Sequence, residues 1–205
     1  MRRVGLFGGT FDPPHLGHLV VAQWALDRLK LDRVLFIPSG TPPHKRGRPV
    51  TPAADRVAMT RLAVRGNRAF EVSTLEARRR GSSYTVDTLR ALRARSGETR
   101  VFLLIGEDSL EQFHTWREPE SILELATLAV APRGGRPARS TRHARRPGQG
   151  AAVPSRRSVW LDSPLILISS SQIRRRSRQG RSLRYMVPEP VAAYIARHRL
   201  YRGRP

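Results

Sequence analysis

Residues 8–18 read Gly-Gly-Thr-Phe-Asp-Pro-Pro-His-Leu-Gly-His, and this stretch decides the predicted fold. The apolar run of residues 4–7 lies directly before it and is typical of a buried strand. Leucine and alanine recur at helical spacing after it, which predicts a helix that begins near Gly17 or His18. A strand, a glycine-rich turn and a helix in this order favour an anion site, because backbone N–H groups and the helix dipole face the same edge of a parallel sheet.

The side chains of this stretch allow more than one interpretation. Gly8 and Gly9 let the backbone approach a phosphate, and His15 and His18 add donors on the same side. Two alternatives stay open: the glycines only close a tight turn, or Asp12 and the histidines bind a metal ion. We expect no protein-bound metal, because a catalytic zinc site needs three ligands in defined geometry and prolines and a glycine interrupt the run.

Length and composition set limits on the class of protein. A chain of 205 residues is long enough for a single α/β domain with a sizeable core. There is no cysteine, which excludes disulfides and thiolate metal sites. The N-terminus lacks the apolar region of a signal peptide, and no apolar run approaches the ~20 residues of a membrane span. We therefore expect a cytoplasmic protein without membrane contact, and homo-oligomers stay open.

The net charge of +22 is concentrated in two arginine-rich stretches. Residues 133–157 carry eight arginines and residues 174–184 carry six, with no acid in either. The first stretch is rich in arginine, proline and glycine and predicts a long flexible loop. Such a basic stretch is one signal of a nucleic-acid partner, but the aromatic residues that would stack on bases are nearly absent among the arginines, which argues against that partner.

The rest of the chain alternates apolar runs with helical patterns. Strands are predicted at 33–38, 69–73, 100–105, 128–131, 158–161 and 165–168, and helices at 51–64, 84–95 and around 191–195. A further helix is predicted after Ser171 as its N-cap, within a small helical C-terminal part at 171–205. This alternation predicts a doubly wound parallel sheet of the Rossmann-like kind, in a single domain covering residues 1–205.

Three segments after predicted strands carry polar residues suited to a nucleotide. The loop after residue 38 contains His44 and Lys45, which can reach a polyphosphate. Gly106 and Asp108 follow the strand at 100–105, where a carboxylate can accept hydrogen bonds from a ribose. Trp116, eight residues beyond Asp108, is either a packed lid residue or a stacking platform.

These segments together resemble the bacterial nicotinate-nucleotide adenylyltransferases of the nucleotidyltransferase superfamily. The resemblance comprises the motif at 8–18, Pro-Pro-His-Lys at 42–45, Tyr-Thr-Val-Asp-Thr-Leu at 84–89, Gly-Glu-Asp at 106–108 with the following tryptophan, and Ile-Ser-Ser-Ser-Gln-Ile-Arg at 168–174. It implies a Rossmann-like nucleotidyltransferase fold that transfers an adenylyl group from ATP, with Mg²⁺, to nicotinate mononucleotide. The products are nicotinate adenine dinucleotide and pyrophosphate.

The resemblance also implies roles for individual residues. The catalytic group is His15, His18, Lys45 and Arg174. ATP is expected to contact Gly8, Gly9, Thr10, Phe11, His15, His18, Gly106, Asp108, Ile168, Ser170, Ser171 and Arg174. Nicotinate mononucleotide is expected to contact Thr10, His44, Lys45, Tyr84, Thr85 and Trp116. Two alternatives stay open: another acceptor, nicotinamide mononucleotide or a phosphopantetheine compound, and a basic nucleic-acid-binding module.

Overall fold

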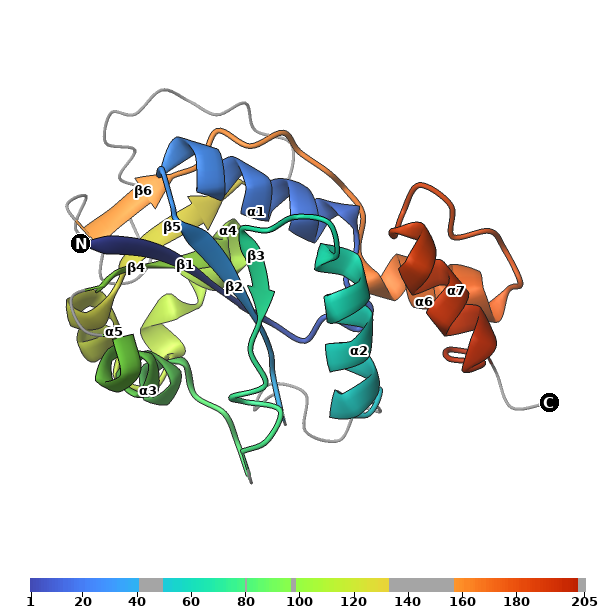
Figure 1. Ribbon diagram of the computed structural model, residues 1–205, viewed down its shortest axis with the longest axis horizontal. Coiled ribbons are helices and arrows are strands. Elements are labelled where there is room, and N and C mark those ends of the chain that lie inside the picture. Colours follow the sequence, from blue (N-terminus) through green and yellow to red (C-terminus); the bar gives the residue numbers. More distant parts are fainter. Residues whose placement is uncertain (41–49, 80, 97–98, 133–156, 203–205) are drawn as a thin grey trace. The chain divides into compact units, whose positions relative to one another are not determined.

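The computed structural model describes residues 1–40, 50–79, 81–96, 99–132 and 157–202 (Figure 1). In chain order the elements are β1 (Arg2–Gly9), α1 (Leu16–Arg28), β2 (Arg33–Pro38), α2 (Ala53–Val64), β3 (Phe70–Val72), α3 (Thr85–Ser96), β4 (Thr99–Gly106), α4 (Glu107–Glu111), the 3₁₀ helix η2 (Phe113–Thr115), α5 (Pro119–Leu125), β5 (Thr127–Ala131), β6 (Ser158–Trp160), α6 (Ser170–Arg178) and α7 (Glu189–Arg197).

The strands form one sheet in the order β3-β2-β1-β4-β5-β6. The ladders that join β1, β4, β5 and β6 are parallel, with Val4 opposite Val101 and Leu104 opposite Ala129. The central part of β4 is buried from Val101 to Ile105, without the alternation of a strand that faces water. Continuous apolar runs of this kind are typical of parallel strands covered on both faces. The structure therefore confirms the predicted doubly wound α/β fold.

The chain groups into two compact units. The first comprises Met1–Gly8, Val21–Val34 and Tyr84–Leu165. Helices α3 and α5 lie side by side in it (Figure 1). The side chain of Arg90 on α3 pairs with Glu118, the N-cap residue of α5. Phe102, Leu128 and Ile122 are fully buried and form part of the apolar interior of this unit.

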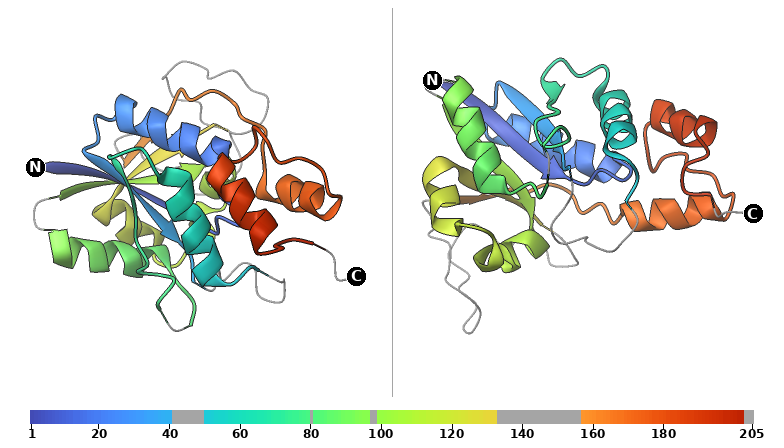
Figure 2. Two further views of the ribbon diagram at one scale, coloured as in Figure 1. Left: turned by 45° about the vertical axis from the view of Figure 1, so that its right-hand side comes forward. Right: turned by 90° about the horizontal axis from the view of Figure 1, so that it is seen from below.

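The second unit comprises Gly9–Val20, Leu35–Ser83 and Ile166–Pro205. Helices α2 and α7 lie side by side in it (Figure 2). Its apolar cluster joins α2, α6 and α7 through Met59, Ala63, Ile173, Val187, Val191 and Ile195. At the edge of this cluster the Tyr194 hydroxyl donates a 2.8 Å hydrogen bond to Asp55 Oδ1, which links α7 to α2.

Three local predictions need correction. Gly8 and Gly9 still belong to β1, so the turn begins at Thr10, and α1 begins at Leu16, slightly before the expected position. Residues 165–168 form no strand, and the side chains of Leu165 and Leu167 are 40% and 73% exposed. An apolar run becomes a strand only where a neighbouring strand offers a ladder, and these four residues instead lead to the N-cap of α6.

The helical elements α4, η2 and α5 were not predicted. Each is between three and seven residues long, which is too short to show a helical period in the sequence. The predicted loop at 133–157 lies outside the described residues, apart from Arg157, and the single-domain organisation stays a prediction. In the described part of the chain, no helix is both long and apolar enough to cross a bilayer.

Candidate functional site

We call residues 9–15, from the last residue of β1 to the start of α1, the motif turn. It lies in the second unit, and donors from distant segments hold its carbonyl groups. Four carbonyl oxygens accept hydrogen bonds in this way: Gly9 O from Ser39 N–H (2.9 Å), Thr10 O from Arg56 Nη1 (2.9 Å), Asp12 O from Arg174 Nη1 (2.6 Å) and Pro13 O from Ser170 Oγ (2.9 Å). A trans peptide is planar, and its N–H points opposite to its C=O. The N–H groups of Thr10 and Phe11 therefore point away from Ser39 and Arg56, to the opposite side of the turn.

Arg56 on α2 is the central support of this turn. It is 1% exposed, and its guanidinium donates to the carbonyls of Thr51, Thr10 and Gly40 at 2.8, 2.9 and 2.9 Å. Burial lowers the pKa of Arg56, and the nearby Asp12 carboxylate opposes that shift. Arg56 was not predicted from the sequence as a residue of the site. The sequence offered one indication of a buried arginine, since Arg56 lies beside the apolar positions Val57 and Met59 of α2.

Asp12 is a buried structural carboxylate, 4% exposed. Its Oδ1 accepts a 2.7 Å hydrogen bond from the Tyr201 hydroxyl, and its Oδ2 accepts one from Thr51 N–H at 3.4 Å. Burial, with the adjacent Asp12 charge, raises the pKa of Tyr201 strongly, so this tyrosine keeps its proton. The described residues contain no group of three His, Cys, Asp or Glu side chains arranged for a metal ion.

The two motif histidines stack on one another, with ring centroids 3.7 Å apart. His15 is 4% exposed, whereas His18 is half-buried. The backbone N–H of His15 donates to His18 Nδ1 at 3.2 Å, so a neutral His18 ring carries its proton on Nε2. Gly17 allows this packing, because a Cβ there would lie 3.1 Å from the His15 ring. The structure thus fixes the orientation of the His18 ring through Nδ1 and the stack.

The start of α1 offers fewer open donors than we expected. The N–H of Leu16 donates to the carbonyl of Met186 at 3.0 Å, and the N–H of His18 donates to the carbonyl of His15 at 2.9 Å. The first N–H groups of a helix have no partner within the helix. Here the loop before α7 supplies one, the carbonyl of Met186.

Helix α6 begins earlier than predicted. Its N-cap is Ser169, which forms a reciprocal capping box with Gln172, so the predicted cap Ser171 lies in the first turn. Arg174 therefore faces the motif turn, and its Nη2 also contacts Ser171 Oγ at 3.1 Å. Ile168 immediately precedes the cap and is half-buried. The structure brings α6 and the motif turn together, as the sequence predicted.

Three of the predicted nicotinate residues, Tyr84, Thr85 and Trp116, lie in the first unit, whereas Thr10 lies in the motif turn of the second unit. Thr85 opens α3, and Tyr84 directly precedes it. The guanidinium of Arg117 lies 4.8 Å from the centre of the Tyr84 ring, which joins the start of α3 to the segment of Trp116. The half-buried Trp116 ring packs against Phe113, with centroids 5.5 Å apart. Arg117 was not singled out from the sequence.

The remaining predicted residues fall in three places. Gly106 ends β4 and Asp108 lies in the first turn of α4, both in the first unit. Gly8 also belongs to the first unit. His44 and Lys45 lie outside the described residues, so their predicted roles stay predictions.

Comparison with known proteins agrees with this arrangement. A family model described as Cytidylyltransferase-like matches residues 6–176. A protein of Thermomicrobium roseum named probable nicotinate-nucleotide adenylyltransferase is 50% identical over 203 residues, covering 98% of this chain and 92% of that protein. One of the same name from Thermus thermophilus is 46% identical over 200 residues, covering 98% and 100%.

Among solved structures, the fold is similar to a Plasmodium falciparum nicotinic acid mononucleotide adenylyltransferase complexed with NaAD. The TM-score is 0.75 at 14% identity, with 98% of each chain covered, which supports the fold alone. The sequence comparisons show the family as well as the fold. The family model covers most of the chain, and the relatives that are 46–50% identical match 98% of it. The chain belongs to the cytidylyltransferase-like family.

Proposed function

We propose that this chain transfers the adenylyl group of ATP to nicotinate mononucleotide. The motif turn carries this proposal, because anchored carbonyls on one side leave backbone N–H groups on the other, beside the stacked His15 and His18. We infer the acceptor, nicotinate mononucleotide, from the names of relatives that are 46–50% identical to this chain. The products are nicotinate adenine dinucleotide and pyrophosphate.

The reaction requires little covalent chemistry from the protein. An oxygen of the acceptor's 5′-phosphate attacks the α-phosphorus of ATP, and the bond from that phosphorus to the bridging oxygen of the β-phosphate breaks. The bonding electrons leave with pyrophosphate, and the attacking phosphate oxygen has no proton to lose. The protein must align the two phosphates and stabilise the charge that develops, which are the main contributions in phosphoryl-type transfers.

The motif turn and His18 suit the α-phosphate. The N–H groups of Thr10 and Phe11, together with His18 Nε2–H, form a set of donors that need not reorganise, because their supports are buried. Arg174 holds the turn through Asp12 O and brings positive charge to the same place. We assign His15 to orienting the His18 ring, since the two rings stack and share a backbone-to-ring hydrogen bond.

The residues of the first unit are proposed to select the nucleosides. Asp108 and Gly106 would contact adenosine, while Trp116 would stack on the pyridine ring. The backbone at Thr85 would meet the nicotinate carboxylate, and Tyr84, held under Arg117, would close that side. His44 and Lys45 complete the proposed set as contacts to the phosphates.

Mg²⁺ is proposed to enter with ATP. The described residues contain no ready group of metal ligands, and both oxygens of Asp12 already accept hydrogen bonds. This arrangement fits an ion bound mainly through substrate phosphates and water, as Mg²⁺ commonly is. When bound, the ion would neutralise charge on the triphosphate.

The decisive experiment compares three acceptors at fixed ATP and Mg²⁺: nicotinate mononucleotide, nicotinamide mononucleotide and phosphopantetheine. Pyrophosphate release and product mass are measured. We expect kcat/KM for the nicotinate compound to exceed that for the amide by at least roughly 10²-fold, since a site built for one hydrogen-bonding group rejects its analogue. Equal values would contradict the proposed acceptor, and no pyrophosphate from any acceptor would contradict adenylyl transfer.

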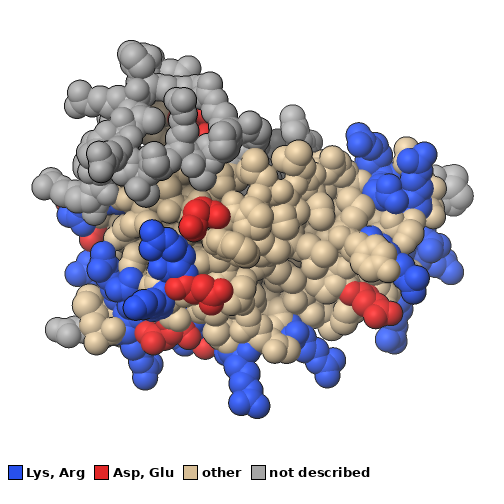
Figure 3. All heavy atoms as spheres, turned by 90° about the horizontal axis from the view of Figure 1, so that it is seen from above, with Lys and Arg blue, Asp and Glu red and all other residues tan. Residues whose placement is uncertain are grey.

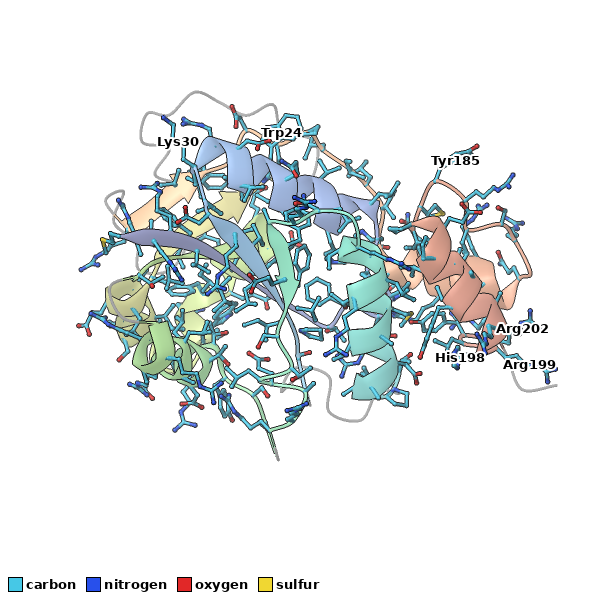
Figure 4. The ribbon with its side chains drawn as sticks, in the orientation of Figure 1. Trp24, Lys30, Tyr185, His198, Arg199 and Arg202 are labelled. Atoms are coloured by element: carbon cyan, nitrogen blue, oxygen red, sulfur yellow. The ribbon has the colours of Figure 1, made fainter. Side chains whose placement is uncertain are left out.

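A tryptophan pair tests the placement of the pyridine ring. Trp116→Ala should raise KM for nicotinate mononucleotide severalfold and leave KM for ATP nearly unchanged. Trp24→Ala is the matched control, because Trp24 lies on α1 with 40% of its surface exposed (Figure 4). An equal effect of both substitutions on that KM would remove Trp116 from the site.

A further inference from the structure

Helix α6 carries a second basic feature on the face away from Arg174. Gln172, Arg175, Arg176 and Gln179 occupy positions i, i+3, i+4 and i+7, which share one helix face. Arg174 lies about 200° around the helix from Gln172 at 100° per residue, and it contacts the motif turn. The basic face is therefore separate from the catalytic group proposed above.

A pocket of about 260 Å³ lies on this face. We call it the α6 pocket, lined by Leu167, Gln172, Arg175, Arg176, Gln179, Arg181 and Met186. Three of the seven lining residues are arginines. Figure 3 shows Lys and Arg side chains gathered over the C-terminal helices.

The turn after α6 builds this pocket. Gly180 has φ +65°, a left-handed conformation that favours glycine, and its N–H donates to the carbonyl of Ser177. The N–H of Arg181 then donates to the carbonyl of Arg176 at 2.9 Å, which turns Arg181 back beside the helix. The Arg176 side chain is itself held, with Nε donating to Ser182 O at 3.1 Å. The backbone turn therefore places Arg181 beside the helix, and a hydrogen bond to the backbone holds the Arg176 side chain.

The charge of the pocket is not balanced by the protein around it. Residues 163–188 contain six arginines and no acid, and within the described part of the chain the three pocket arginines form no ion pair. Arginines in the last turn do complement the helix dipole. That effect accounts for Arg175 and Arg176, but Arg181 lies beyond the helix, and bringing it back adds repulsion.

From this geometry we propose that the α6 pocket binds a small anion with two linked phosphate groups. Guanidinium groups pair with phosphate oxygens through two parallel hydrogen bonds, and the amides of Gln172 and Gln179 add further donors. The volume suits a compact anion, since sites for larger organic ligands usually start at about 300 Å³. Among the described residues, no aromatic ring lines the pocket for stacking a base. The nearby Tyr185, in the loop between α6 and α7, is 85% exposed (Figure 4). The proposal does not depend on adenylyl transfer.

Calorimetric titration with inorganic pyrophosphate tests the pocket. The variant Arg175→Gln/Arg181→Gln should lose one equivalent of bound pyrophosphate, or bind it at least tenfold more weakly, at low salt. The matched control Arg199→Gln/Arg202→Gln removes the same charge near the end of α7 (Figure 4) and should titrate like the unmodified protein. Both variants should keep the kcat and melting temperature of the unmodified protein.

Two results would overturn the proposal. One is equal pyrophosphate binding by the pocket variant and its control. The other is a titration with duplex DNA in which only the pocket variant loses affinity while its pyrophosphate binding is unchanged, which would identify the surface as a nucleic-acid contact. Failure of adenylyl transfer would appear instead as missing product in both variants and in the unmodified protein, with the lost pyrophosphate equivalent still measurable.

Discussion

The hydroxyl of Tyr201 supports the motif turn through Asp12, and its removal in Tyr201→Phe tests that support. The hydroxyl donates a 2.7 Å hydrogen bond to a carboxylate that is 4% exposed. Among the described residues, the other oxygen of Asp12 accepts one long hydrogen bond, 3.4 Å from Thr51 N–H. Phenylalanine keeps the ring and leaves a buried negative charge short of a donor.

The expected loss of stability is substantial. A hydrogen bond to a charged group contributes about 1.5–3 kcal/mol, and water cannot readily replace it at this buried position. For a chain of this size a loss of about 2 kcal/mol lowers Tm by roughly 4–8 °C. The Asp12 carbonyl accepts from Arg174, so a shifted Asp12 also misplaces the turn. We expect kcat to fall by roughly 10–10²-fold.

Tyr194→Phe is the matched control. Its hydroxyl donates to Asp55 Oδ1 at 2.8 Å, in the same unit but away from the turn, and both residues are half-buried. Water can partly replace that bond, so the loss of stability should be about 0.5–1.5 kcal/mol, with kcat unchanged.

Melting temperature, ATP affinity and kcat are measured on one preparation of each variant. The double variant Asp12→Asn/Tyr201→Phe completes a mutant cycle, and Tyr201→Phe should add little to the effect of Asp12→Asn if the hydroxyl acts through that carboxylate. Normal kcat in well-folded Tyr201→Phe would refute the argument that the tyrosine positions the turn, and additive losses in the cycle would refute its action through Asp12.

Two further predictions concern separate parts of the chain. His18→Ala should lower kcat by roughly 10²–10³-fold, like the loss of one donor from a preorganised oxyanion site, with ATP affinity and Tm nearly unchanged; near-normal kcat in folded protein would remove His18 from catalysis. Glu118 in the first unit accepts hydrogen bonds from Arg90, which hold its pKa below the usual 4.5, so its stabilising effect is present above that pH and is lost as pH falls through the lowered value. Glu118→Gln should therefore lower Tm at pH 7, and the difference from the unmodified protein should shrink below about pH 4.5; a difference independent of pH would contradict this.

Some features of this protein followed from the sequence alone. The strand at 33–38 was predicted with its observed bounds, and those at 100–105 and 128–131 to within a residue. Buried strands of a parallel sheet are apolar throughout, so a local run of side chains already identifies them. The motif at 8–18 and the segment at 168–174 predicted a shared anion site, which stays a prediction, and the hydrogen bonds from Ser170 and Arg174 to the motif turn show that the two segments meet.

Other features were decided only by the tertiary structure. The apolar run at 165–168 became a linker, since a strand also needs a partner ladder, which no local pattern records. Arg56 and Tyr201 support the motif turn from positions 46 and 189 residues away from their acceptors Thr10 and Asp12. Hydrogen bonds over such separations depend on how α2 and the C-terminal segment pack, and packing is a property of the whole chain.

The clearest contrast concerns α6. The sequence indicated a serine-capped helix with arginines. A cap at the predicted Ser171 would place Arg175 and Arg176 near the first turn, against the helix dipole, but the observed cap is Ser169. In the structure they lie in the last turn, where positive charge is favourable, and the return of the chain at Gly180 brings Arg181 beside them. The composition of the sequence thus determined that α6 is basic. The cap and the closing turn decided that Arg174 faces the motif turn, whereas Arg175, Arg176 and Arg181 line a separate pocket.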